Sequence, residues 1–458
     1  MSLAEVRSSA VAPVWLPGLA PLRGLGALLV VGYHVWEQAG YAPLDAGRGR
    51  DLVAGGYSGV DLFFVLSGCV LFLPVARAGG SIGRWRDFWV RRLARIYPLY
   101  LLVLLVAVLA HAQLTRHATA LPPAAAGWRL LGLHLTFLEQ PWIGTDDNRL
   151  GLGVVSVVWT LSVEACFYLL LPFVARVFFR HPWVWTAAVV AFSRVWDWYG
   201  SHLSDWAPGL PAHRGPAGLS YAQTHITMNF PGYAGHFALG MLIAYALVRF
   251  ADSAVMPGLR RCAPLVVVAG AAAYGWFLQW DGHRTVFGLD RDWTHQTVTW
   301  RALPGIVLLV VGAALATGRF QRVLASRPAH WSGEVSYGFY LLHYPAMVGV
   351  LIALGTPLGR NHAAVILVGV AAASLVLADV VHRLVEVPAR TWLRRRLSSR
   401  PPRRSLDDAV RDPATAIRLR EAPGPADRPG GHPSPRSPSP QAEPTGTSRS
   451  TTATGRRS

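Results

Sequence analysis

Residues 58–76 read SGVDLFFVLSGCVLFLPVA, an almost uninterrupted apolar run. A helix of about 20 residues crosses a hydrocarbon core of roughly 30 Å, so this run is long enough to span a membrane. Composition supports that interpretation, because 52% of the 458 residues are hydrophobic and only 15% are charged. Such a composition is poorly suited to a soluble surface. The chain is therefore predicted to be a membrane protein.

Similar apolar runs recur on both sides of this stretch, and about ten are long enough to span. They lie near residues 19–36, 58–76, 95–111, 157–177, 183–199, 231–248, 263–280, 302–318, 335–353 and 363–385. A shorter stretch, Trp128–Leu138, is expected to pack at the interface or to re-enter. The predicted fold is all-α, a polytopic integral membrane helical bundle. It divides into an N-terminal segment (1–14), a membrane domain (15–396) and a tail (397–458).

Arginine clusters predict the orientation of the bundle. All 43 basic residues are Arg, and clusters follow every second predicted span, whereas the intervening connections are poor in Arg. Since positive charge favours the cytoplasmic side, both termini are expected there. The tail is rich in Pro, Ser, Gly and Arg without apolar periodicity and is expected to be disordered. It holds no aromatic residue between its arginines, which argues against nucleic acid as a partner.

The three cysteines exclude a disulfide framework and any Cys-rich metal site, and no metal is expected. The informative residues are polar side chains inside predicted spans, because each is costly there and marks a candidate functional site. In the first span, Arg23 and His34 are eleven residues apart. At about 100° and 1.5 Å per residue they share one helix face, about 16 Å apart.

Four further segments place polar residues in or beside predicted spans. Asp61 enters the second span at the depth of His34, where a carboxylate could orient the imidazole or cap the helix start. A cluster of Arg91, Arg92 and Arg95 at the start of the third span suits a phosphorylated ligand and equally serves as a topology signal. Glu164 and His343 lie deep in the fourth and ninth spans, where either could be a contact between helices.

Taken in order, these segments resemble the acyltransferase 3 family, which includes O-antigen acetylases and macrolide acyltransferases. The resemblance covers roughly residues 15–390. It rests on Arg23 and His34 with ten residues between them, GVDLFFVLSG (59–68), RRLARI (91–96) followed by Pro98, WTLSVE (159–164), SYGFYLLHYP (336–345) and Glu386-Val387-Pro388. One departure is Ala165 and Cys166 after Glu164, where members often carry another acid or a Gln.

The resemblance implies an integral membrane O-acyltransferase. An acyl group, often acetyl, would pass from cytoplasmic acyl-CoA to a hydroxyl of a carbohydrate or natural product. His34 is expected to be the general base, and the catalytic candidates are His34, Asp61 and Glu164. The arginines expected to hold the CoA phosphates by charge-assisted contacts are Arg23, Arg91, Arg92 and Arg95. Further candidates near the substrate are Ser67, Trp159, Tyr337 and His343.

One mechanistic alternative and one functional alternative remain. A covalent acyl-Ser67 intermediate is conceivable, but direct transfer is preferred because the sequence places no base beside Ser67. A transporter or flippase without covalent chemistry would use the same polar residues to line a path, although no internal repeat favours it. In either case we expect a multi-pass protein of the bacterial inner (plasma) membrane. Its expected partners are the bilayer and a carbohydrate or small-molecule acceptor, with no prediction of oligomeric state.

Overall fold

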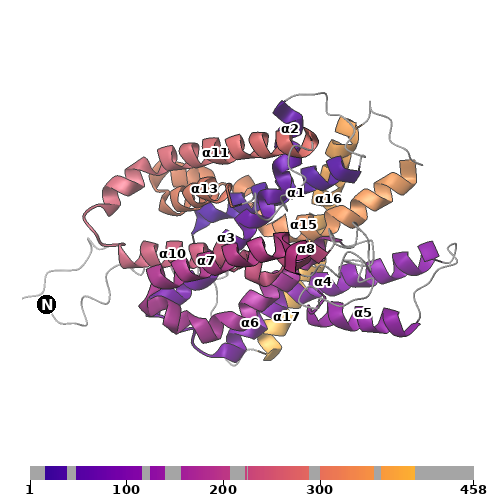
Figure 1. Ribbon diagram of the computed structural model, residues 1–458, viewed down its shortest axis with the longest axis horizontal. Coiled ribbons are helices and arrows are strands. Elements are labelled where there is room, and N and C mark those ends of the chain that lie inside the picture. The colour runs from indigo at the N-terminus through magenta and orange to yellow at the C-terminus, as the bar shows by residue number, and fades with distance from the viewer. Residues whose placement is uncertain are drawn as a thin grey trace, which may run out of the picture. The chain divides into compact units, whose positions relative to one another are not determined.

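The computed structural model describes residues 16–38, 48–115, 124–139, 156–206, 222–223, 225–287, 300–354 and 363–397. All of these lie in one compact unit, Met1–Pro401. Within them every regular element is helical, as Figure 1 shows, so the predicted all-α class is confirmed. The predicted N-terminal segment and most of the predicted tail lie outside the described residues.

The first half of the unit contains α1 (Ala20–Gln38), α2 (Arg48–Ala54), α3 (Gly59–Arg77), α4 (Trp85–Thr115), α5 (Ala124–Thr136), α6 (Trp159–Arg180), α7 (Pro182–Ser201) and α8 (Leu203–Trp206). The second half contains α10 (Phe230–Arg249), α11 (Met256–Phe287), α13 (Leu303–Leu315), α14 (Gly318–Leu324), α15 (Arg327–Leu354), α16 (Ala363–Val381) and α17 (Val387–Leu397), with a π-helical turn, His382–Glu386, between the last two.

Seven helical segments among the described residues are long and apolar enough to cross a membrane, and the bent pair α13–α14 makes up to eight. The chain is therefore a multi-pass membrane protein. The predicted spans near 183–199 and 335–353 are helical too, as α7 and α15. The count of ten and the cytoplasmic location of both termini stay predictions.

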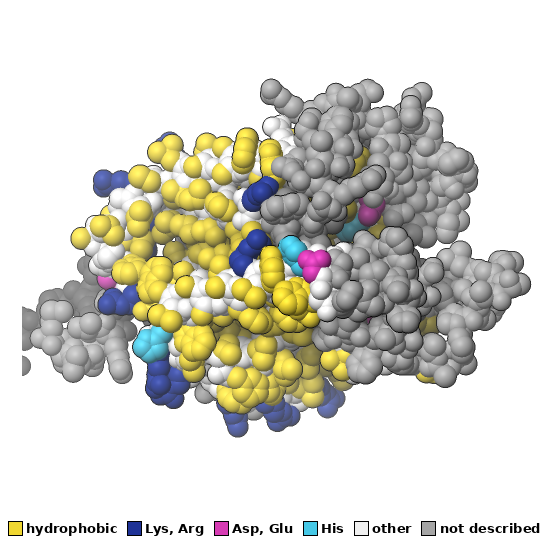
Figure 2. Space-filling model, viewed as in Figure 1, with side chains coloured by type: hydrophobic (Ala, Val, Ile, Leu, Met, Phe, Trp, Pro, Cys, Tyr) yellow, Lys and Arg dark blue, Asp and Glu magenta, His cyan; other side chains and the backbone are white. Residues whose placement is uncertain are grey.

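Exposed apolar side chains fit a lipid environment. Hydrophobic side chains dominate the described part of the face that carries α7 and α11 (Figure 2). On α7, Trp183 and Val184 are exposed, as are Leu265 and Val268 on α11. Water would disfavour such faces, whereas lipid tails would cover them without cost. Both helices are therefore suited to the outside of the bundle.

Helix α3 is the centre of the core, and most of its residues are buried. It packs along α10 through glycines on both helices. A Cβ at Gly68 would stand 2.2 Å from the carbonyl oxygen of Phe237, and one at Gly240 2.1 Å from that of Val65. Only glycine permits backbones to approach this closely, a packing mode typical of membrane helices.

Helix α1 lies between α3 and α15 and contacts both. At its first turn, a Cβ on Gly333 of α15 would stand 2.5 Å from the carbonyl oxygen of Ala20. This close approach holds the face of α1 that carries Arg23 and His34 against α15. The order α3–α1–α15 therefore positions the candidate site.

Candidate active site

A cavity of about 70 Å³ lies between α1, α3, α4, α6 and α15, and we call it the central cavity. Its polar lining residues are Arg23, Ser67, Arg95, Thr160, Glu164, Ser336, Tyr337 and Tyr340. The apolar part of the wall includes Val60 and Phe64 of α3. Five helices that are distant in sequence thus bring ionisable and hydroxyl side chains into one buried space.

Ser67 and Glu164 meet across this cavity. The Ser67 hydroxyl donates a hydrogen bond to Oε1 of Glu164 at 2.8 Å. The preference for direct transfer rested on the lack of a base beside Ser67, and the structure places a carboxylate there. The direct and the covalent route are therefore both chemically accessible, and an experiment can distinguish them.

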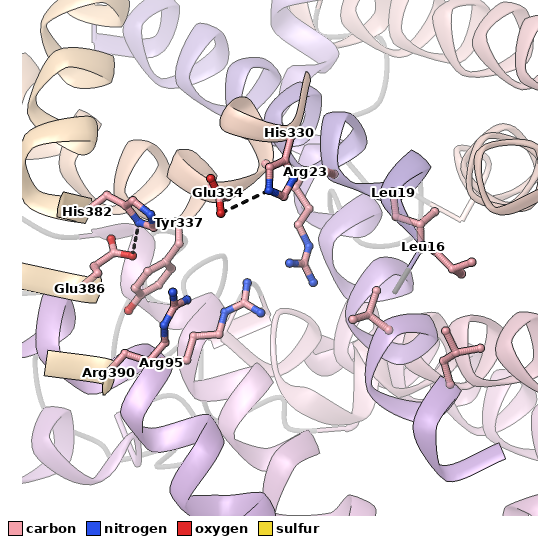
Figure 3. A pocket seen from close by; sticks show the side chains of 14 residues that line it. Leu16, Leu19, Arg23, Arg95, His330, Glu334, Tyr337, His382, Glu386 and Arg390 are labelled. Atoms are coloured by element: carbon pink, nitrogen blue, oxygen red, sulfur yellow. Dashed lines mark hydrogen bonds and ion pairs between the residues drawn. The ribbon is translucent and has the colours of Figure 1, made fainter. Parts of the chain in front are cut away.

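A second cavity, of about 210 Å³, adjoins the first, and we call it the arginine cavity. Arg23 of α1, Arg95 of α4 and Arg390 of α17 line it, and their side chains surround the same space in Figure 3. Arg23, Arg95 and Tyr337 line both cavities, so the two spaces meet at these side chains. Three guanidinium groups from three helices make this region suited to an anionic ligand.

The two carboxylates in the arginine cavity each have a histidine neighbour. His330 Nε2 lies 3.4 Å from Oε1 of Glu334, and His382 Nδ1 lies 3.1 Å from Oε2 of Glu386 (Figure 3). Both pairs are one helical turn apart in sequence, the spacing at which helix side chains meet. The acids therefore have partners other than the three arginines.

His34 and His343 face each other between α1 and α15. Nδ1 of His34 lies 3.1 Å from Nε2 of His343, and the rings stack with centroids 5.1 Å apart. His343 is completely buried, and its Nδ1 lies 2.5 Å from the carbonyl oxygen of Tyr340. The Tyr340 ring lines the central cavity, and its centroid is 6.0 Å from that of His343. The His34–His343 pair therefore lies next to Tyr340, which lines the central cavity.

Asp61 has a different partner from the one that the sequence suggested. Its Oδ1 lies 2.7 Å from Nε2 of His236 on α10, and both side chains are buried. Asp61 is one residue beyond Val60, which faces the central cavity. That step turns it by about 100° around α3 toward α10. The imidazole that Asp61 contacts is thus that of His236, while His34 contacts His343.

Most of the membrane unit matches a known family. The sequence signature of the acyltransferase domain of the acyltransferase 3 family matches residues 18–383. The chain belongs to this family. It is an acyltransferase, and the resemblance noted from its motifs is confirmed.

Relatives of this protein are themselves named as acyltransferases or O-acetyltransferases. The acyltransferase MdmB of Streptomyces mycarofaciens is 28% identical over 86% of this chain and 97% of its own length. The peptidoglycan O-acetyltransferase OatA of Listeria monocytogenes is 22% identical over 82% of this chain, but over only 56% of its own length. The putative peptidoglycan O-acetyltransferase YrhL of Bacillus subtilis is 24% identical over the same share of the chain and 55% of its own length. No solved structure gives a significant match.

The four arginines expected to bind the donor separate into two groups in this acyltransferase. Arg23 and Arg95 line both cavities. Arg92 instead lies over the rings of Phe88 and Tyr168, at 5.9 and 6.0 Å from their centroids, and Arg91 is part of neither lining. Arg390 lines the arginine cavity although it was not among the expected site residues, and the Glu386-Val387-Pro388 motif beside it was a usable signal.

Two candidates near the substrate, Tyr337 and Trp159, differ in whether they reach the cavities. Tyr337 lines both cavities and donates a hydrogen bond from its hydroxyl to the carbonyl oxygen of Ile96 at 2.9 Å. Trp159 packs against Tyr233, with ring centroids 5.6 Å apart, rather than lining either cavity. Within the described ranges no three His, Cys, Asp or Glu side chains are arranged to hold a metal ion.

A buried acid lies on the other side of α6. Glu139 follows α5 and accepts a hydrogen bond from the Ser162 hydroxyl, and Nδ1 of His134 lies 3.9 Å from its Oε1. Burial raises the pKa of Glu139 to about 7, an effect that the Ser162 hydrogen bond opposes. Burial also lowers the pKa of His134 to about 4. Because burial disfavours both charged forms, this cluster is adapted to neutral side chains.

Proposed function

We propose that this protein transfers an acyl group, acetyl being the first candidate, from cytoplasmic acyl-CoA to a hydroxyl of a carbohydrate or natural product. Three arginines that converge on one cavity, which in turn meets the central cavity, carry the proposal. The membrane in question is the bacterial inner (plasma) membrane, since the named relatives come from bacteria.

The arginine cavity would hold the anionic part of the donor. Coenzyme A carries several phosphate charges, and guanidinium groups bind phosphate through charge-assisted, often bidentate hydrogen bonds. Arg23, Arg95 and Arg390 would supply these contacts. The histidine partners of Glu334 and Glu386 reduce competition for the arginines.

The chemistry would take place further along α1. His34 lies eleven residues after Arg23, about 16 Å along the helix, and the central cavity extends from Arg23 to Tyr340 beside the histidine pair. The flexible arm of the donor would follow this cavity. His34 would take the proton of the acceptor hydroxyl while the oxygen attacks the thioester carbonyl. A positioned general base of this kind contributes typically about 10² to 10⁴ in rate.

The names of the relatives support the choice of acceptor class. One relative is named as an acyltransferase, and two are named for O-acetylation of peptidoglycan, a carbohydrate polymer. A carbohydrate hydroxyl is therefore the first acceptor to test, with small hydroxylated natural products such as macrolides next.

The test uses purified full-length protein in lipid nanodiscs with radiolabelled acetyl-CoA and, in separate reactions, soluble peptidoglycan fragments, other glycans and a macrolide. We expect label to move from CoA to one acceptor class and His34→Ala to lower the rate by about 10² to 10⁴. A transporter would leave all the label on CoA. Full transfer by the His34→Ala protein would exclude His34 as the base.

A further inference from the structure

The two histidines constrain each other's protonation. A neutral imidazole has one N–H and one nitrogen with a lone pair. Nδ1 of His34 and Nε2 of His343 lie 3.1 Å apart, so one must donate and the other accept. A second contact, made by His343, determines which of the two nitrogens carries the hydrogen.

The second contact is between His343 and its own helix. Nδ1 of His343 lies 2.5 Å from the carbonyl oxygen of Tyr340. A carbonyl oxygen can only accept, so Nδ1 of His343 carries the hydrogen. In neutral His343 the lone pair is then on Nε2, the atom that faces His34. His34 must therefore donate from Nδ1.

We propose that His343 is the positioning residue of this enzyme, holding His34 with its hydrogen on Nδ1 and its lone pair on Nε2. The proposal rests on the proposed function, in which His34 is the general base. It gives His343 the part that a carboxylate plays in a serine–histidine–aspartate triad, where the partner fixes the tautomer of the base. Asp61 is not available for that part, because it pairs with His236.

The proton and electron pairs then balance over one cycle. The acceptor O–H gives its proton to Nε2 of His34, and its electron pair forms a C–O bond to the thioester carbonyl carbon. The C–S bond breaks with its pair on sulfur, and the thiolate takes the proton back from Nε2. Throughout, Nδ1–H of His34 stays donated to Nε2 of His343, so the ring keeps its orientation while it is charged.

The direct test is nuclear magnetic resonance of the full-length protein labelled with nitrogen-15 histidine, in nanodiscs without substrate. Couplings between ring nitrogens and carbon-bound protons identify the tautomer, and a His34→Gln sample assigns the signals. We expect the Nδ1–H tautomer at both His34 and His343. In His343→Phe we expect His34 to change toward the Nε2–H tautomer, which free histidine prefers in water. An Nε2–H tautomer at His34 in the unmodified protein overturns the proposal, as does an unchanged His34 signal in His343→Phe.

Activity supplies a second, independent test. His343→Leu removes the acceptor and should lower kcat by about 10² to 10⁴ with the donor KM unchanged, as misorientation of a triad histidine does. His343→Gln retains an amide oxygen that can accept from Nδ1–H, and should recover most of that loss. His181→Leu, at an exposed histidine between α6 and α7, is the matched control.

The outcomes separate the two proposals. If His34→Ala abolishes transfer while His343→Leu keeps full kcat, the positioning role is wrong and the proposed function stands. If His34→Ala is fully active, the general base is wrong, and the tautomer measurement still tests the hydrogen-bond assignment. Because that measurement uses the unmodified protein, a variant that fails to fold does not prevent it.

Discussion

The Ser67 hydroxyl donates a hydrogen bond to Glu164 at 2.8 Å, across a cavity that both residues line. Because a carboxylate contacts the Ser67 hydroxyl, a covalent route through an acyl-Ser67 intermediate can be tested. A carboxylate is ordinarily a much weaker base than an imidazole, which favours direct transfer through His34.

Replacement of Ser67 by Ala should therefore lower kcat by less than the roughly 10²-fold minimum expected for the loss of a general base, because on the direct route Ser67 only donates a hydrogen bond to Glu164. The measurement is the initial rate of acetyl transfer, together with mass spectrometry of the protein after incubation with donor alone. Loss of all activity, or an acetyl group trapped on Ser67 in the unmodified protein, would establish the covalent route instead.

Replacement of Arg390 by Ala should weaken donor binding. Arg390 shares the arginine cavity with Arg23 and Arg95, and a hydrogen bond between charged groups contributes about 1.5–3 kcal/mol. We expect the donor KM to rise about ten- to a hundredfold with kcat changed far less. Arg395→Ala is the matched control, since Arg395 lies on the same helix, is exposed and is not part of the cavity lining. Equal effects of the two substitutions would show that Arg390 contributes charge alone.

Glu139 predicts how stability depends on pH. Its pKa is about 7 in the folded protein against an ordinary value of 4.5. The folded state therefore binds more protons than the unfolded state between these values, so this group's contribution to stability is full below pH 4.5 and is lost as the pH rises through 7. At pH 8 the ionised, buried carboxylate should cost on the order of 3 kcal/mol.

The Glu139→Gln substitution removes this titration and leaves that of His134 in place. The variant should melt at a higher temperature than the unmodified protein at pH 8, and the difference should shrink toward pH 4.5. Thermal unfolding of both proteins in the same detergent across this range is the measurement. A difference that does not depend on pH would mean that Glu139 does not titrate there.

The sequence was informative where local pattern decides the structure. Hydropathy predicts α3 and its neighbours because a span must be apolar along its whole length. Helical spacing likewise places Arg23 and His34 on one face of α1, and Arg23 and Arg95 both reach the cavities.

Contacts between distant helices were beyond a single sequence. The pairing of His34 with His343 depends on how closely α1 approaches α15, which small residues such as Gly333 permit. The direction of Asp61 depends on which side of α3 the helix α10 packs. Neither packing choice is encoded in periodicity, because a helix that is apolar all round has no face that marks its partner.

Asp61 and His236 supply the last prediction, because their contact separates a structural role for Asp61 from a catalytic one. Both side chains are buried and 2.7 Å apart. Removing one member of a buried polar pair leaves the other without a partner and typically costs about 3–5 kcal/mol of stability, whereas replacing both with apolar residues of similar volume is often neutral.

Asp61→Leu and His236→Leu should each lower the melting temperature strongly, and the double variant should be more stable than either single variant. If Asp61 holds α3 to α10 without touching the chemistry, the double variant should also keep kcat within about tenfold, a rate loss smaller than that expected for a general base. A stable double variant with its turnover abolished would instead return Asp61 to the catalytic residues.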